Sequence, residues 1–267
     1  MTRSTVHFLS AFTFVFTLSS TSLAQDALPK KVPVPADNPM TVDKIELGKQ
    51  LYFDPRLSAS GTISCNSCHN IMAGGDDSRP VSLGHHAQLG GRGAPTVWNS
   101  AFLSVQFWDG RAATLEEQAK GPLINPVEMG MKSHDVLVAD RIAKITGYQA
   151  EFAKVFGKNS LNIDNVAKAI ATFERTLITP NSAFDRYIKG NKKAMSAEAI
   201  EGFNTFKSVG CITCHSGVNF AGPALAVGTG FFQKFPLIEN PELVKKYGFW
   251  EDPGRLQATK IEADRKS

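Results

Sequence analysis

Cysteine is scarce in this 267-residue sequence, in which only four occur. All four lie in two short motifs, at Cys65/Cys68 and Cys211/Cys214, so none is left for a separate disulfide framework. Long apolar runs are missing as well, and no stretch of the mature chain approaches the ~20 residues of a membrane span. Net charge is low, with 29 Lys and Arg against 25 Asp and Glu, so nothing indicates a nucleic-acid partner.

Charge is almost absent from the N-terminus, where Arg3 is the only charged residue before Asp26. An apolar run over residues 8–18 follows Arg3, and Ser22-Leu23-Ala24 matches a small-x-Ala cleavage site. This pattern predicts a signal peptide over residues 1–24. An uncleaved N-terminal anchor is the alternative interpretation.

Each cysteine pair is followed directly by a histidine, which gives Cys65-Asn66-Ser67-Cys68-His69 and Cys211-Ile212-Thr213-Cys214-His215. Two thiols about one helical turn apart can add to the two vinyl groups of one haem, and the histidine can then ligate the iron. A structural zinc site wants four ligands, and a redox C-x-x-C pair has no need of the histidine. The two motifs therefore predict two covalently bound haem c groups. Such haem attachment takes place outside the bacterial cytoplasm, so we expect a periplasmic protein.

Helical patterns dominate the chain after residue 40. Thr41, Ser133 and Ser196 each precede an amphipathic stretch and can act as its N-cap. Thr114 opens a capping-box sequence, and we expect the short helix that follows to end at Gly121-Pro122. No strand pattern is convincing, so the predicted fold class is mainly α.

The clearest helix is expected from about Asp164 to Leu177. Its apolar residues recur at spacings of four, three and four, which places one face toward a core. These residues are Val166, Ile170, Phe173 and Leu177. Pro180 is expected to stop this helix. Residues 70–100, in contrast, are rich in Gly, Pro, Asn and Asp and are expected to form a long irregular loop around the first haem.

A weak internal repeat indicates two halves, because an amphipathic helix containing Gly48 or Gly202 precedes each haem motif. After an extended, proline-rich segment at residues 25–40, we expect two cytochrome c-like haem domains over residues 41–179 and 180–267. Residues 216–267 contain no capped, periodic helix that could close the second domain. A lone haem domain needs such burial, so we expect the second domain to be incomplete.

The sixth iron ligand decides what each haem can do. His85 and His86 stand in a Gly-rich loop within reach of the first haem, and the residues alone leave open which of them ligates it. Residues 216–267 contain no His and no Met, so the second haem has no obvious distal ligand in its own half. The remaining candidates come from elsewhere or are lysines: Met129, Met131, Met195 and Lys234.

Several distinctive motifs follow one another in a fixed order from about residue 41 to the second haem motif. They are Leu51-Tyr-Phe-Asp-Pro-Arg-Leu-Ser58, Gly61-Thr-Ile-Ser-Cys-Asn-Ser-Cys-His-Asn70, Gly74-Gly-Asp-Asp77, Gly84-His85, Ala94-Pro-Thr-Val97, Gln106-Phe-Trp-Asp-Gly-Arg-Ala112, Asn125-Pro-Val-Glu-Met-Gly130 and Phe173-Glu-Arg-Thr-Leu-Ile-Thr-Pro-Asn-Ser182. With these motifs the chain closely resembles bacterial dihaem cytochrome c peroxidases. The resemblance thins over residues 230–260.

The resemblance implies roles for the histidines. His69 matches the proximal ligand of the low-potential peroxidatic haem, which belongs to the predicted domain 41–179. His85 matches the distal ligand of that haem, which leaves when the other haem is reduced. His215 matches the proximal ligand of the high-potential haem that receives electrons, in the predicted domain 180–267.

The resemblance also implies three further site residues. Trp108 matches the residue on the electron path between the haems, and a packed core or interface tryptophan is compatible with that role. Glu128 matches the acid/base of the distal pocket, and Gln118 matches a polar residue that lines it. From the residues alone, Glu128 is one acid among 25, so its assignment depends on the resemblance.

Two departures from the family pattern concern calcium and the C-terminus. Family members usually have an Asn, contributing to an interdomain Ca²⁺ site, where this chain has Gly93. The other Ca²⁺ ligands and the distal Met of the electron-receiving haem lie in a C-terminal segment that this sequence does not contain. We therefore expect a weakened Ca²⁺ site and a C-terminally truncated member of the family.

The expected activity is reduction of hydrogen peroxide to water with electrons from a small periplasmic cytochrome c or cupredoxin. A dihaem electron-transfer cytochrome, or an inactive remnant of a peroxidase, is the alternative. Relatives that oxidise protein substrates keep a Tyr as distal ligand, where this chain has His85. No membrane span is expected in the mature chain, and a homodimer is compatible with the resemblance.

Overall fold

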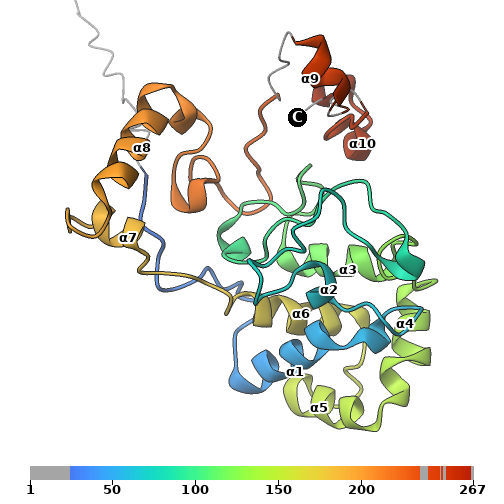
Figure 1. The fold of residues 1–267 in the computed structure, drawn as a ribbon. Helices are drawn as coiled ribbons and strands as arrows, with labels where there is room; N and C mark the ends of the chain where they lie inside the picture. Colours follow the sequence, from blue (N-terminus) through green and yellow to red (C-terminus); the bar gives the residue numbers. More distant parts are fainter. Residues whose placement is uncertain (1–24, 235–239, 247, 249–250, 266–267) are drawn as a thin grey trace, which may run out of the picture.

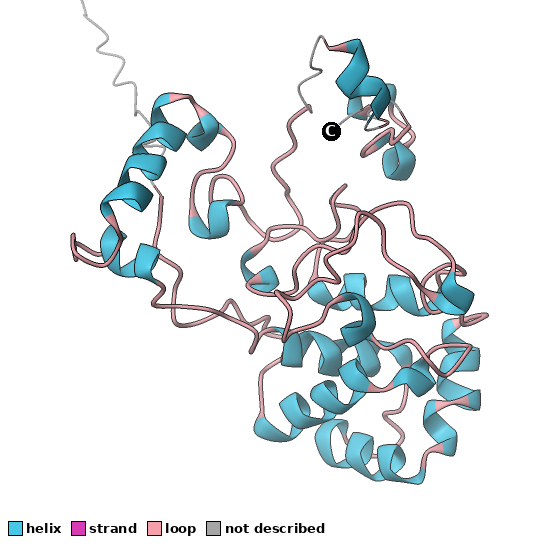
Figure 2. Cartoon of the chain, viewed as in Figure 1, coloured by secondary structure: helices cyan, strands magenta, loops and turns pink. Residues whose placement is uncertain are grey.

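The computed structural model describes residues 25–234, 240–246, 248 and 251–265. The predicted signal peptide, residues 1–24, lies outside them. The described residues form helices and irregular loops without a named strand, and only isolated bridges pair the loops (Figure 2). The mainly α fold class is therefore confirmed. None of the described helices is long and apolar enough to cross a membrane.

Two crossing helices organise the first half of the chain. Helix α1 (Val42–Phe53) begins where Thr41 Oγ1 accepts a hydrogen bond from Lys44 N at 3.2 Å, as predicted. Helix α6 (Ile163–Glu174) packs across it (Figure 1). Gly48 makes the close approach between them, since a Cβ there would come nearer to Ala169 O than the 3.0 Å limit of real contacts.

The remaining helices surround this pair or lie beyond it. They are α2 (Cys65–Cys68), α3 (Leu115–Ile124), α4 (His134–Asp140), α5 (Thr146–Phe156), α7 (Ala183–Ile188), α8 (Ala197–Ser208), α9 (Pro241–Lys246) and α10 (Leu256–Thr259). Within the described residues, the main buried apolar cluster is drawn entirely from residues 47–177. All four residues of the predicted α6 face belong to it.

Two predicted helix ends were wrong. Helix α3 continues past Gly121-Pro122 to Ile124, because Pro122 lies in the last turn, where it removes one hydrogen bond, while Leu123 gains full burial. Helix α6 ends at Glu174 and not at Leu177. After Glu174 the backbone turns more tightly, with hydrogen bonds between residues three apart instead of four, such as Thr176 N to Phe173 O at 2.8 Å. This happens well before Pro180.

The second half has almost no buried core. Helices α7 and α8 stand apart from the α1–α6 group (Figure 1), and no residue of α8 is buried. In place of a core, four aromatic rings contact one another with centroids 5.0–5.7 Å apart; they are Phe184, Phe203, Phe206 and Phe220. Among the described residues, no atom lies within 4 Å of the Cβ position of Gly202, in contrast to Gly48.

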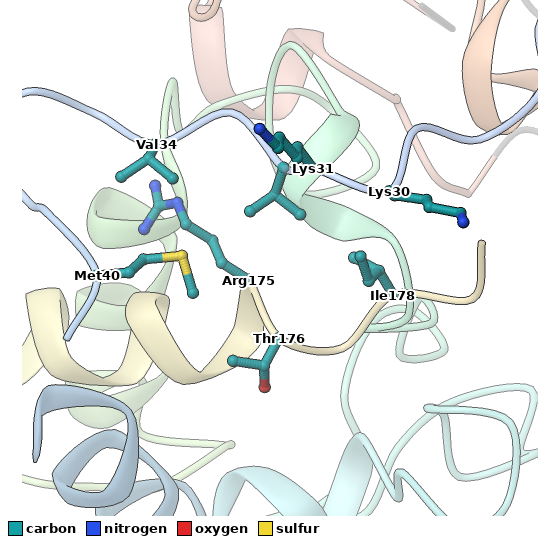
Figure 3. Close-up of a pocket in the computed structure, with 8 residues that line it drawn as sticks. Lys30, Lys31, Val34, Met40, Arg175, Thr176 and Ile178 are labelled. Atoms are coloured by element: carbon teal, nitrogen blue, oxygen red, sulfur yellow. The ribbon is translucent and has the colours of Figure 1, made fainter. Parts of the chain in front are cut away.

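The segment 25–40 is free of helix and runs alongside both halves of the chain (Figure 1). Gln25 Nε2 donates to His215 O, and Leu28 N donates to Asp185 Oδ1 at 2.7 Å. Near its other end, the fully buried Asn38 donates to Lys168 O at 3.0 Å. Between these anchors lies a cavity of about 360 Å³ lined by Lys30, Lys31, Val32, Val34, Met40, Arg175, Thr176 and Ile178 (Figure 3).

One buried acid stands at the end of α6 without a full set of partners. Glu174 is 6% exposed, and its Oε2 has no hydrogen-bond partner among the described residues. Burial raises the pKa of Glu174 to about 8, and the nearby carboxylate of Glu116 adds to this rise while Arg175 opposes it. The side chain is therefore protonated in the folded protein at neutral pH.

The two glycines provide a matched pair of substitutions. Gly48→Ala should lower the free energy of unfolding by about 1–3 kcal/mol, because the new methyl group overlaps Ala169 O and forces α1 and α6 apart. Gly202→Ala meets open space and should stabilise α8 by roughly 0.5–1 kcal/mol. Urea unfolding of both variants measures the difference, and equal effects would contradict this account of the two helices.

Glu174 should make stability depend on pH. Between its ordinary pKa of 4.5 and the folded value of about 8, the folded state holds a proton that the unfolded state releases. The free energy of unfolding should therefore fall as pH rises through this window, by about 1.4 kcal/mol for each unit of pKa shift at full effect. Glu174→Gln should remove most of this slope. Urea titrations at pH 5, 6, 7 and 8 measure it, and parallel curves for both proteins would show that Glu174 is ionised.

Candidate functional site

The first haem motif forms one helical turn that packs against α1. Helix α2 contains Cys65 and Cys68, and His69 N closes the turn by donating to Cys65 O at 2.9 Å. Tyr52, a buried residue of α1, donates from its hydroxyl to His69 O at 2.6 Å. The helix pair α1/α6 therefore fixes the backbone that carries both thiols and the histidine.

The His69 side chain is oriented for metal ligation. Its Nδ1 lies 2.9 Å from Pro95 O, and because a carbonyl oxygen only accepts, Nδ1 must carry the proton. The lone pair of Nε2 is then available to a metal ion, in the arrangement typical of ligating histidines. Burial lowers the pKa of His69, which favours the neutral imidazole that a metal needs.

The second haem motif repeats this arrangement on a more open surface. His215 Nδ1 lies 3.2 Å from Phe220 O, so Nε2 is again the free nitrogen. The ring of Phe206 lies 6.3 Å from the His215 ring, and Phe206 follows Gly202 by four residues, just as Tyr52 follows Gly48. Cys211 and Cys214 are both exposed.

The thiols of the first motif are available for thioether bonds, since neither Cys65 nor Cys68 forms a disulfide. Burial raises the pKa of Cys65 to about 12 and also raises the pKa of Cys68. Across the described ranges, no three His, Cys, Asp or Glu side chains gather as a metal-binding group. The residues present thus fit two haem c groups, each with two thioether bonds and one histidine.

The loop of His85 is joined to the segment of Glu128. His85 N donates to Glu128 O at 2.7 Å, and a Cβ on Gly84 would overlap Val127 O, so only glycine allows this contact. His85 Nδ1 is buried without a hydrogen-bond partner in the described part of the chain. His86 is exposed, and its ring is tilted by 46° against the His85 ring with the centroids 3.8 Å apart. The structure therefore brings His85 and Glu128 together.

Glu128 is a partly buried acid held by a neighbour. Asn125 Nδ2 donates to Glu128 Oε1 at 3.0 Å, and burial raises the pKa of Glu128 although Arg111 opposes the rise. Gln118 is half-buried on α3, the helix that ends just before Asn125. A partly buried carboxyl with a raised pKa keeps its proton to a higher pH than an exposed one, which suits it to donate or accept a proton in a site.

Trp108 lies in a different environment from the packed one that the sequence suggests. Its side chain is 65% exposed, and its Nε1 donates to Gly93 O at 2.9 Å. Sequence reasoning missed the residue before it, Phe107, whose φ of 66° is unusual for a bulky side chain. Arg111 covers the Phe107 ring at 3.4 Å, so this strained turn projects Trp108 outward.

Two of the methionines proposed for the second haem are committed elsewhere. Met129 and Met131 are 3% and 5% exposed and belong to the apolar cluster of the first half. Met195 is half-buried beside the start of α8.

Comparisons with known proteins agree with these observations. A model of the Di-haem cytochrome c peroxidase family matches residues 42–193. The cytochrome c551 peroxidases of Nitrosomonas europaea and Pseudomonas aeruginosa are 45% and 43% identical over 87% and 89% of this chain. The chain spans only 66% of the length of each of these relatives.

The fold is also similar to that of a solved relative. The crystal structure of a MauG-like protein associated with microbial copper homeostasis superimposes with a TM-score of 0.71 at 26% identity, covering 90% of this chain and 72% of that protein. Together with the family match over more than half of the sequence, this identifies the fold and the cofactor class. The chain belongs to the di-haem cytochrome c peroxidase family.

Proposed function

We propose that this chain reduces hydrogen peroxide to two molecules of water, using two electrons and two protons per turnover. The observation that carries the proposal is the direct link between His85 and the partly buried acid Glu128, beside the first haem motif. The haem held by Cys65 and Cys68 supplies the iron at which peroxide binds and is reduced. The named activity of the cytochrome c551 peroxidase relatives supports the same reaction.

His85 and Glu128 have complementary roles in this proposal. In the proposal, His85 would be the residue that ligates the iron in the oxidised protein, and it would leave on reduction of the second haem and so open the site to peroxide. Its backbone bond to Glu128 O keeps the acid close to the vacated position. Glu128 takes a proton from the nearer peroxide oxygen and returns it to the farther one, while Asn125 holds Oε1 and Gln118 lines the site.

The second haem would be held by Cys211, Cys214 and His215, and it would supply the entry point for electrons in this proposal. The exposure of both cysteines supports a docking site for a small cytochrome c or cupredoxin. Trp108 then lies on the path to the first haem. An exposed second motif also suits a dihaem electron carrier, which is the second candidate function and lacks peroxide turnover.

We further propose a periplasmic location, because covalent haem attachment and the predicted signal peptide both point to export. A homodimer would be compatible with the family. Calcium binding, if retained, would need ligands other than an Asn side chain at position 93, and the carbonyl of Gly93 already accepts the Trp108 indole N–H. Equilibrium dialysis with ⁴⁵Ca²⁺ tests this site directly.

Glu128→Gln should leave both haems attached and lower peroxide turnover by ~10²-fold or more, because the amide keeps the size of the side chain but cannot relay a proton. Stopped-flow turnover with a reduced small cytochrome c measures the effect. Glu46→Gln, an exposed change on α1, is the control and should behave like the parent protein. Undiminished activity of Glu128→Gln would remove this residue from the mechanism.

His85→Gly should convert the first haem from a low-spin to a high-spin EPR signal in the oxidised protein, since the distal ligand is lost. Peroxide should then react without prior reduction. His86→Gly is the matched control, because His86 is exposed and its ring lies against the His85 ring. If only His86→Gly changes the spin state, the assignment of His85 is wrong.

A further inference from the structure

The residue after Trp108 is a buried carboxylate surrounded by arginines. Asp109 is only 3% exposed, and its carboxylate accepts from Arg92 Nη1 at 2.7 Å and from Arg111 Nη1 at 3.0 Å. Its backbone oxygen accepts from Arg255 Nη1 at 2.7 Å. Although burial alone would raise it, the hydrogen bond from Arg92 and the charge of Arg111 hold the pKa of Asp109 below its usual value.

Arg92 connects this carboxylate to a distant part of the chain. Its Nε and Nη2 donate to Asp252 at 2.6 and 2.8 Å, and Nη2 also reaches Gly254 O at 3.2 Å. Arg255 stacks on the Phe232 ring at 3.8 Å. The segment 252–255 therefore contacts Asp109 in two ways. Asp252 binds Arg92, which also binds the Asp109 carboxylate, and Arg255 donates to the Asp109 backbone oxygen.

Arg92 and its neighbour hold two consecutive residues of the opposite loop. The Arg92 side chain binds Asp109, and the carbonyl of Gly93 accepts the indole N–H of Trp108. These four residues form a closed ring of backbone and side-chain bonds. The indole N–H bond to Gly93 O and the ion pair of Arg92 with Asp109 therefore hold the loop of Trp108 at two consecutive positions.

We propose that Asp109 and Arg92 are positioning residues for Trp108, and that Arg92 lets the segment 252–255 set where the indole stands. This inference depends on the proposed function, in which Trp108 lies on the electron path between the haems. It adds that a charge network takes part in holding this path. Loosening the network should therefore move the indole while leaving both haems in place.

The direct test is Asp109→Asn in the haem-loaded, full-length chain. Hydrogen exchange of the Trp108 indole N–H, followed by NMR of ¹⁵N-labelled protein, should become about tenfold faster, because Gly93 O no longer faces a fixed donor. Trp98 is an internal reference, since its Nε1 donates to Ile71 O at 3.2 Å outside the network. Its exchange should not change.

Asp54→Asn is the matched control variant. Asp54 is equally buried and is paired with Arg56 at 2.7 Å, but it lies at the end of α1 and touches no member of the network. It should leave Trp108 exchange unchanged. If Asp109→Asn fails to fold, Asp252→Asn weakens the link between Arg92 and the distant segment, where Gly254 O remains as a partner, and it should accelerate Trp108 exchange by a smaller factor.

Two outcomes would overturn the inference: equal acceleration at Trp98 and Trp108, or no acceleration at Trp108 in either network variant. The rate of electron transfer between the haems, measured after rapid reduction, should fall together with the exchange protection. Trp108→Phe separates this inference from the proposed function. If that variant transfers electrons at the parent rate, the proposed path is wrong, while the exchange experiment still decides whether Asp109 positions the indole.

Discussion

The close contact of α1 with α6 at Gly48 is the constraint on which the first site depends. It lets two helices cross backbone to backbone, which buries Tyr52 fully and points its hydroxyl at His69 O. The backbone of the first haem motif is therefore held in place, and Pro95 O orients the His69 ring through its Nδ1. A larger side chain at position 48 would disturb the contact of α1 with α6 and, through Tyr52, the position of His69.

The second half has the same local parts without that constraint. Its motif histidine also donates from Nδ1 to a carbonyl oxygen, and an aromatic residue again follows a helix glycine by four positions. Yet Gly202 contacts none of the described residues, and α8 buries none of its own. The carbonyl that orients His215 belongs to the same loop, at Phe220, so this orientation does not need a crossing helix, whereas burial of the motif does.

Sequence reasoning succeeded where the signal is local. The N-caps Thr41, Ser133 and Ser196 each accept the expected backbone hydrogen bond, and the apolar face of α6 is buried as its spacing predicts. It failed at the end of α3, where burial of Leu123 outweighs a proline. The sequence did not reveal the network of Arg92. The two acids that Arg92 binds, Asp109 and Asp252, lie 17 and 160 residues away, and charged residues carry no sequence pattern that pairs them.

The contact of Gln25 with His215 has a consequence for the order of folding. These residues are 190 positions apart, so the start of the described chain cannot make this contact until the second motif is available. The contacts of α1 with α6 span a shorter length of chain and can form earlier, although they too require loop closure. Residues 25–31 are thus among the last parts of the chain to reach their folded position. The surface around the second motif stays uncovered until then.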